Sequence, residues 1–100
     1  MNNVQLSEMS KKNLKPITRR GQWWVVLLND NRNTFEDVTN ALMDVCGHAY
    51  LQAVQCAVIT HEAGQCKVYT DIYEECEQVY KYLRELGLRV SLEKCSGSEK

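Results

Sequence analysis

The side chains of this sequence best suited to chemistry are short polar groups that follow directly on an apolar run. Asn29, Asp30 and Asn31 supply one negative charge with several amide and carbonyl groups, and His61 adds a ring nitrogen that can accept or donate. A free α-ammonium group matches this set, because it carries a positive charge and donor hydrogens that need acceptors around them. The same residues could form only a turn and the start of a helix, and the pattern alone leaves both interpretations open.

The element that must present this cluster is the apolar run Trp23–Leu28. Its β-branched and aromatic residues predict a strand that is buried on both faces or packed centrally by helices. The following residues, 29–33, predict a turn, since Asn and Asp side chains bond nearby backbone groups. A helix then begins at Asn33 or Thr34, with Glu36 and Asp37 placed for a capping box, and Gly47 ends it. Its apolar face consists of Phe35, Val38, Leu42 and Val45.

His61 lies near the end of a second predicted helix, Ala49–Glu62, which ends near Gly64. Ala57 and Thr60 are its neighbours at helical spacing, so all three side chains share one surface. Two small side chains beside a histidine leave space for a ligand.

The remaining elements complete a small sheet. A short strand is predicted at Cys66–Tyr69, then a helix capped by Asp71 and ended by Gly87, then a last strand at Leu88–Leu92. The core stripe of that helix is expected to contain Ile72, Cys76, Val79, Tyr80 and Leu83. The order β-α-α-β-α-β predicts a small two-layer α/β (α+β) sandwich, with a three-stranded sheet and helices on one face.

The length and composition fit one small globular domain. The chain has 100 residues, of which 44% are hydrophobic and 25% charged. No apolar run is long enough to span a bilayer, and the first residues lack a signal-peptide core, so we expect a cytoplasmic protein without membrane contact. Five cysteines without a signal sequence indicate reduced thiols.

The charge is unevenly distributed along the chain. Residues 1–22 carry a net charge of +4 and residues 23–100 one of −5. The acidic body argues against nucleic acid as the main partner. We expect residues 1–22 to be a flexible extension, residues 23–94 the folded domain and residues 95–100 a frayed tail.

Metal and nucleophile chemistry have little support in the sequence. It has no C-x-x-C and no H-x-x-x-H, so we expect no metal and no cofactor. Cys66 and His61 could form a Cys–His nucleophile, but no oxyanion-hole motif accompanies them. Cys46, Cys56 and Cys76 are interpreted as small core residues.

Four motifs with matching order and spacing give the chain a family resemblance. They are V-V-L-L-N-D-N, T-H-E-A-G, V-Y-T and V-S-L-E, and they lie between Trp23 and Glu93. This region resembles the ClpS family of protease adaptors. The resemblance implies a non-enzymatic, monomeric adaptor. It would bind N-degron proteins with a bulky apolar first residue and deliver them to a Clp AAA+ unfoldase (ClpA or ClpC) and its ClpP peptidase.

The resemblance also implies roles for single residues. Asn29, Asp30 and His61, with Asn31 beside them, match the positions that contact the α-amino group. The positions of the side-chain pocket are Asn33, Phe35, Val38, Ala57, Thr60 and Leu88. The extension would engage the unfoldase pore and the acidic body its N-terminal domain. The alternative is a regulatory domain that binds the unfoldase with little or no N-degron recognition.

Several residues depart from the common family pattern. Asn31 stands where a second Asp is usual, which lowers the negative charge available to an ammonium. Phe35, Ala57 and Thr60 replace Met, Met and Val, which predicts a pocket that is wider, more polar and capped by an aromatic ring. These changes resemble the divergent second adaptor type of photosynthetic bacteria.

Overall fold

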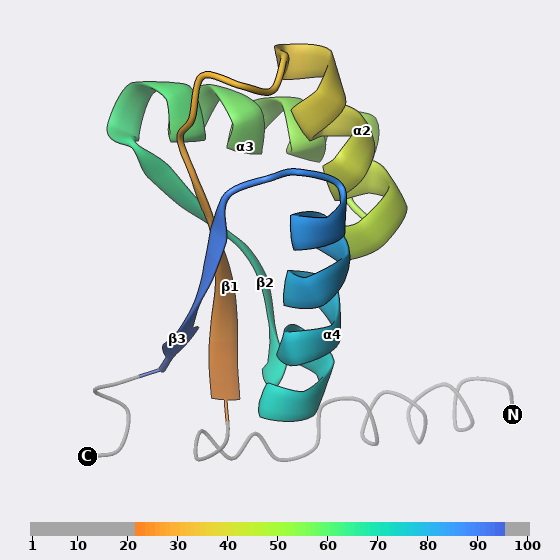
Figure 1. The fold of residues 1–100 in the computed structure, drawn as a ribbon, viewed down its shortest axis with the longest axis vertical. Coiled ribbons are helices and arrows are strands. Elements are labelled where there is room, and N and C mark those ends of the chain that lie inside the picture. The colour runs from red at the N-terminus through yellow and green to blue at the C-terminus, as the bar shows by residue number, and fades with distance from the viewer. Residues whose placement is uncertain (1–21, 96–100) are drawn as a thin grey trace, which may run out of the picture.

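The computed structural model describes residues 22–95. Most of the predicted extension 1–22 and of the predicted tail 95–100 therefore lies outside the described residues. The elements are β1 (Gln22–Leu28), α2 (Phe35–Cys46), α3 (Tyr50–Ala63), β2 (Gln65–Ile72), α4 (Tyr73–Glu85) and β3 (Val90–Lys94). This order, visible in Figure 1, confirms the predicted β-α-α-β-α-β arrangement.

The apolar run forms the central strand of the sheet. The strand order is β2-β1-β3, and β1 pairs antiparallel with both neighbours. Val25, Val26 and Leu27 are almost completely buried. Of these, Val25 and Leu27 belong to the main core cluster, as the two-residue alternation of a strand requires. The continuous apolar run is explained by this central position.

The three helices form the second layer. Helix α4 packs on all three strands, while α3 contacts β2 and α2. In Figure 1, α4 runs beside the strands and α3 crosses one end of the sheet. Leu42 of α2 and Leu83 of α4 are fully buried between the layers. The predicted two-layer sandwich is confirmed.

The junction between β2 and α4 differs from the prediction. Strand β2 continues to Ile72, because it pairs with the whole length of β1 and places Asp71 opposite Trp23. Asp71 stays in extended backbone, so it does not cap the helix, and the N-cap position belongs to Ile72, which has no capping side chain. Ile72 is also 47% exposed, so its predicted place in the core stripe was wrong.

The last strand begins two residues later than predicted. Leu88 lies in the loop before β3, where its backbone amide donates to the carbonyl of Leu83 at 3.0 Å and its side chain is buried. Gly87 makes this turn possible with a φ of 91°, which a side chain would disfavour. Pairing with β1 then sets the strand at Val90–Lys94.

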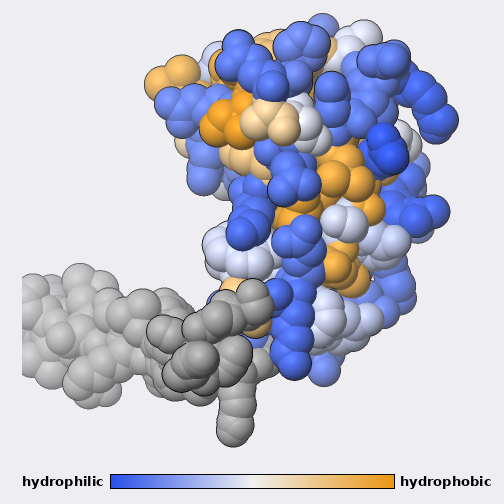
Figure 2. Space-filling view, turned by 90° about the vertical axis from the view of Figure 1, so that its left-hand side faces the viewer, coloured by the Kyte–Doolittle hydropathy of each residue, from blue (hydrophilic) through white to orange (hydrophobic). Residues whose placement is uncertain are grey.

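Helix α3 is apolar on its outer side as well as its inner side. Its exposed hydrophobic residues are Tyr50, Leu51, Val58 and Ile59. Figure 2 shows hydrophobic areas among hydrophilic side chains on one face, including the upper end of the molecule, where α2 and α3 lie in Figure 1. No helix within residues 22–95 is long and apolar enough to cross a membrane.

Candidate functional site

A cavity of about 380 Å³ opens where β1 ends. This volume is within the range typical of small-ligand sites. Its walls come from the end of β1, the loop into α2, the two helices α2 and α3, and the loop before β3. The lining residues are Leu27, Leu28, Asn29, Asp30, Asn33, Thr34, Phe35, Val38, Ala57, Thr60, His61 and Leu88.

The wall from α3 is made of small side chains. Ala57 and Thr60 are each 5% exposed, so they form the inner surface of the cavity. The hydroxyl of Thr60 donates to the carbonyl of Cys56 at 2.7 Å. Because this bond satisfies the hydroxyl within the helix, Thr60 adds less polarity to the cavity than its residue type suggests.

The wall from α2 carries the aromatic residue of the site. Phe35 lies in the first turn of the helix and is 50% exposed, whereas Val38 is half-buried one turn further on. Thr34 caps this helix by accepting from the amide of Asp37 at 3.0 Å, which fixes where Phe35 leaves the loop. Phe35 is thus placed at the mouth of the cavity and Val38 deeper.

Asp30 brings the negative charge of the site. Burial alone would raise the pKa of its carboxyl group, but hydrogen bonds from the amides of Arg32 and Asn33 and from the side chain of Asn33, with the nearby Arg32 charge, together lower the pKa. The amide of Arg32 donates to Oδ1 at 2.8 Å and that of Asn33 at 3.2 Å. Asp30 is therefore ionised at neutral pH and held in one orientation by its own loop.

Asn33 joins two loops that border the cavity. Its Nδ2 donates to the carbonyl of Gly87 at 2.8 Å and lies 3.4 Å from Oδ2 of Asp30. A single amide thus connects the loop after β1 to the loop after α4. This contact places Leu88, the next residue after Gly87, against the cavity.

The backbone of Asn29 is anchored on both sides. Its amide donates to the carbonyl of Gly64 at 3.0 Å, and its carbonyl accepts from Nη1 of Arg89 at 3.2 Å. Gly64 ends α3 with a φ of 95°, so this bond ties the end of β1 to the helix that carries His61. The side chain of Asn29 and the ring of His61 are exposed. They are therefore open to an incoming ligand.

Nine of the ten predicted site residues line this cavity. The exception is Asn31, which lies in an adjoining groove instead. The turn explains this position. The amide of Arg32 donates to the carboxylate of Asp30, so the chain reverses there and Asn31 lies at the exposed tip of the turn. Sequence reasoning missed Leu27, Leu28 and Thr34. The first two are the end of the apolar run and the third is the helix cap, so their positions gave some signal.

The structure does not bring Cys66 to the cavity. Its thiol donates to the carbonyl of Lys67, and only His61 of the possible Cys–His pair lines the site. Within residues 22–95, no group of three or more His, Cys, Asp or Glu side chains could hold a metal ion.

Comparisons with a protein-family model and with solved structures both identify ClpS proteins as similar to this chain. A family model described as ATP-dependent Clp protease adaptor protein ClpS matches residues 18–91. Among solved structures, Agrobacterium tumefaciens ClpS2 bound to L-phenylalaninamide is similar, with a TM-score of 0.64 and 22% identity. The match covers 73% of this chain and 95% of that one. No curated protein matches the sequence.

Proposed function

The chain belongs to the ClpS family of ATP-dependent Clp protease adaptor proteins, and from this premise we propose that it binds the free N-terminus of N-degron substrates. It would deliver them to a Clp AAA+ unfoldase and so change which substrates the protease degrades. The observation that carries the proposal is the cavity at the end of β1. Polar groups with one ionised carboxylate stand at one side of it and apolar walls at the other.

The polar side of the cavity suits an α-ammonium group. Asp30 supplies the charge, while the side-chain oxygen of Asn29 and a ring nitrogen of His61 are further hydrogen-bonding atoms. An acceptor-rich group of this kind favours a charged amine over a neutral amide. In this proposal the three residues hold the first nitrogen of the substrate.

The apolar side suits the first side chain of the substrate. The small residues Ala57 and Thr60 leave room between the helices, and Phe35, Val38 and Leu88 provide apolar contact. The similar Agrobacterium protein was solved with L-phenylalaninamide. That molecule has a free α-amine and an aromatic side chain, which is the chemistry of an N-terminal residue.

Physical magnitudes make such binding strong enough to be useful. Burial of a Leu or Phe side chain contributes about 1.5–3 kcal/mol. Hydrogen bonds to charged groups contribute about 1.5–3 kcal/mol each. Two or three such contributions sum to roughly 3–9 kcal/mol, and the cost of association lowers the net value, so we expect weak to moderate affinity. An adaptor that must release its cargo needs affinity of this order.

The proposed partner is the N-terminal domain of ClpA or ClpC. The folded region carries more acidic than basic residues, so a basic or mixed surface on the unfoldase would complement it. We propose that the adaptor acts as a monomer in the cytoplasm.

The direct test compares peptides that begin with Leu or Phe with the same peptides acetylated at the N-terminus. Acetylation removes the positive charge, so we expect affinity to fall by at least about tenfold, as measured by fluorescence anisotropy. Delivery is tested by degradation of a Leu-led reporter by unfoldase and ClpP with and without the adaptor. Equal binding of free and acetylated peptides would refute N-terminus recognition, even if the protein bound the unfoldase.

A further inference from the structure

A second groove, of about 720 Å³, adjoins the first cavity on the side away from α3. It lies between the loop after β1 and the segment from the end of α4 into β3. Its lining residues are Asn29, Asp30, Asn31, Arg32, Arg84, Gly87, Leu88, Arg89 and Val90. Asn29, Asp30 and Leu88 line both spaces, so the groove is continuous with the proposed N-terminus site.

The groove is lined by arginines, although the domain as a whole carries more acidic than basic residues. Residues 22–95 contain eleven acidic and six basic side chains, and the three arginines of this region all line the groove. Arg32 is separated from Arg84 and Arg89 by more than fifty residues, so only the fold brings these charges together. Half of the basic residues in this part of the chain therefore face one groove.

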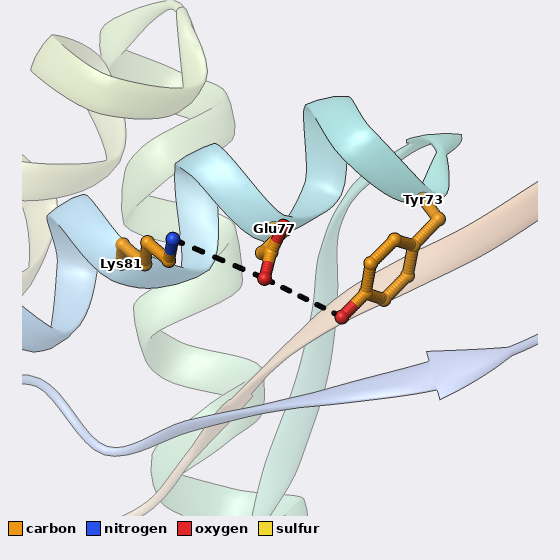
Figure 3. A network of polar contacts seen from close by, with 3 residues as sticks. All are labelled: Tyr73, Glu77 and Lys81. Carbon is orange, nitrogen blue, oxygen red and sulfur yellow. Dashed lines mark hydrogen bonds and ion pairs between the residues drawn. The ribbon is translucent and has the colours of Figure 1, made fainter.

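None of these arginines forms a salt bridge with a carboxylate of the described chain, although the charge of Arg32 acts on the nearby Asp30. The one ion pair found there joins Lys81 and Glu77 at 3.9 Å on the surface of α4, where Tyr73 also contacts Glu77 (Figure 3). Arg84 instead donates to the hydroxyl of Tyr80 at 3.0 Å, and Arg89 donates to the carbonyl of Asn29. Each guanidinium has five N–H groups, so most of its donors remain free.

Asp30 is the acidic residue among those that line the groove, and its carboxylate already accepts hydrogen bonds within its own loop. Its Oδ1 accepts from the backbone amides of Arg32 and Asn33, and it faces the proposed ammonium position. With three arginines and one carboxylate among its lining residues, the groove has a positive net charge. A planar carboxylate is the group that a guanidinium binds best, because two parallel N–H donors fit its two oxygens.

The groove begins at residues of the proposed ammonium site, within reach of the first residues of a bound peptide. Consecutive Cα atoms of a chain are 3.8 Å apart, so the three residues after the first span roughly 10 Å. If the α-ammonium lies at Asn29 and Asp30, these residues leave the site at the residues that both spaces share. Their side chains can then reach the arginines.

We propose that the arginine groove selects substrates with an acidic side chain at the second, third or fourth position. This inference rests on the proposed N-terminus recognition and adds a second determinant to it. The first residue is read in the cavity, and a Glu or Asp downstream is read by Arg32, Arg84 and Arg89. The adaptor therefore distinguishes among proteins that share one N-terminal residue.

The test measures the affinity of Leu-led peptides in which Glu replaces Gln at position two, three or four in turn. At low salt, Glu at the best position should tighten binding about two- to fivefold, which is the strength of exposed ion pairs. The gain should shrink as ionic strength rises, because salt screens exposed charges. In Arg84→Gln the preference should fall, while affinity for the Gln peptides stays unchanged.

Lys81→Gln provides the matched control for Arg84→Gln. Lys81 lies on the same helix, three residues earlier and outside the groove, and its loss changes net charge equally. The Glu preference should persist in this variant. Two results would contradict selection by the groove but leave N-terminus recognition intact. One is binding of the Gln and Glu peptides with equal affinity, and the other is an equal loss of the Glu preference in both variants. Failure of all free-N-terminus peptides to bind would overturn both.

Discussion

Asp30 has two tasks that its geometry makes compatible. Its Oδ1 accepts from two backbone amides, and this shapes the turn after β1. The same bonds keep the pKa of the carboxyl group below its ordinary value of 3.8. Since the pKa is lowered, the stabilisation of the folded state by Asp30 is present above 3.8 and is lost as pH falls through the folded pKa. The charge for ligand binding is lost over the same acid range.

Asp30→Asn should separate the two tasks. The amide oxygen of Asn can still accept from the turn, but the negative charge is gone. We expect the affinity for a Leu-led peptide at pH 7 to fall by at least about tenfold, because hydrogen bonds to charged groups are worth about 1.5–3 kcal/mol. Isothermal titration measures the affinity, and thermal unfolding verifies the fold. If the folded variant bound the peptide with wild-type affinity, the proposed role of Asp30 in binding the α-ammonium group would be wrong.

Ala57 determines how wide the cavity is between the helices. Replacement by Met adds a flexible side chain at a position only 5% exposed, so it should narrow the cavity. We expect affinity for peptides led by Phe or Tyr to fall about tenfold relative to those with smaller first residues. The measurement is anisotropy across a panel of N-terminal residues. Gln55→Met, on the exposed side of the same helix, is the control and should leave the ranking unchanged.

At the scale of the elements, the site depends on how two loops are joined. The loop after β1 and the loop after α4 are far apart in sequence, and the side chain of Asn33 connects them through Gly87. The end of α3 is attached to β1 separately, through the bond from Asn29 to Gly64. The cavity is therefore shaped by a few bonds at the ends of elements, which position α2, α3 and the loop after α4 around the end of β1.

Asn33→Ala should weaken both stability and binding. It removes the bond to Gly87 and the contact with Asp30, so we expect a loss of about 1–2 kcal/mol in unfolding free energy and about tenfold in peptide affinity. Urea unfolding and anisotropy measure the two effects. Asp37→Ala is the control, because Asp37 does not line the cavity and its loss removes one capping bond of α2 while the bond from its amide to Thr34 remains. It should lower stability with affinity changed by less than about twofold; a similar affinity loss there would contradict a special role for Asn33.

At the scale of the whole molecule, three of the cysteines are part of the hydrophobic core or pack against it. Cys56 and Cys76 are buried, and Cys46 packs against the same cluster. Burial in this apolar environment raises the pKa of Cys46 and Cys56 to about 12 and that of Cys76 to about 11, from an ordinary 9.0. The prediction that these three are small core residues is confirmed for Cys56 and Cys76, and Cys46 packs against the core from a partly buried position.

These shifts predict the behaviour of the domain in alkali. Because the raised pKa favours the protonated thiol in the folded state, stability should be unaffected by these groups below pH 9 and should fall as pH rises from about 9 to 12. Urea unfolding across this range measures the slope, and Cys56→Ala should reduce it. At pH 8, alkylation of the three thiols should be much slower in the folded than in the unfolded chain. Equal rates in both states would show that these thiols are not protected.

The sequence by itself determined the kinds of elements, their order and most of the cavity. These features depend on local physics: the continuous apolar run of a central strand, the helical spacing of Val38 and Leu42, and the polar turn that begins at Asn29. Nine of the ten predicted residues line the cavity, and the pocket positions Asn33, Phe35, Val38 and Leu88 among them were predicted from the family resemblance.

Only the tertiary structure decided the rest. Pairing with the full length of β1 extended β2 to Ile72 and took Asp71 away from the helix cap. The internal bonds of the turn directed Asn31 out of the cavity. The groove that gathers Arg32 with Arg84 joins segments that only the fold makes neighbours. Such features depend on contacts between residues distant in sequence, and local propensity carries no information about them.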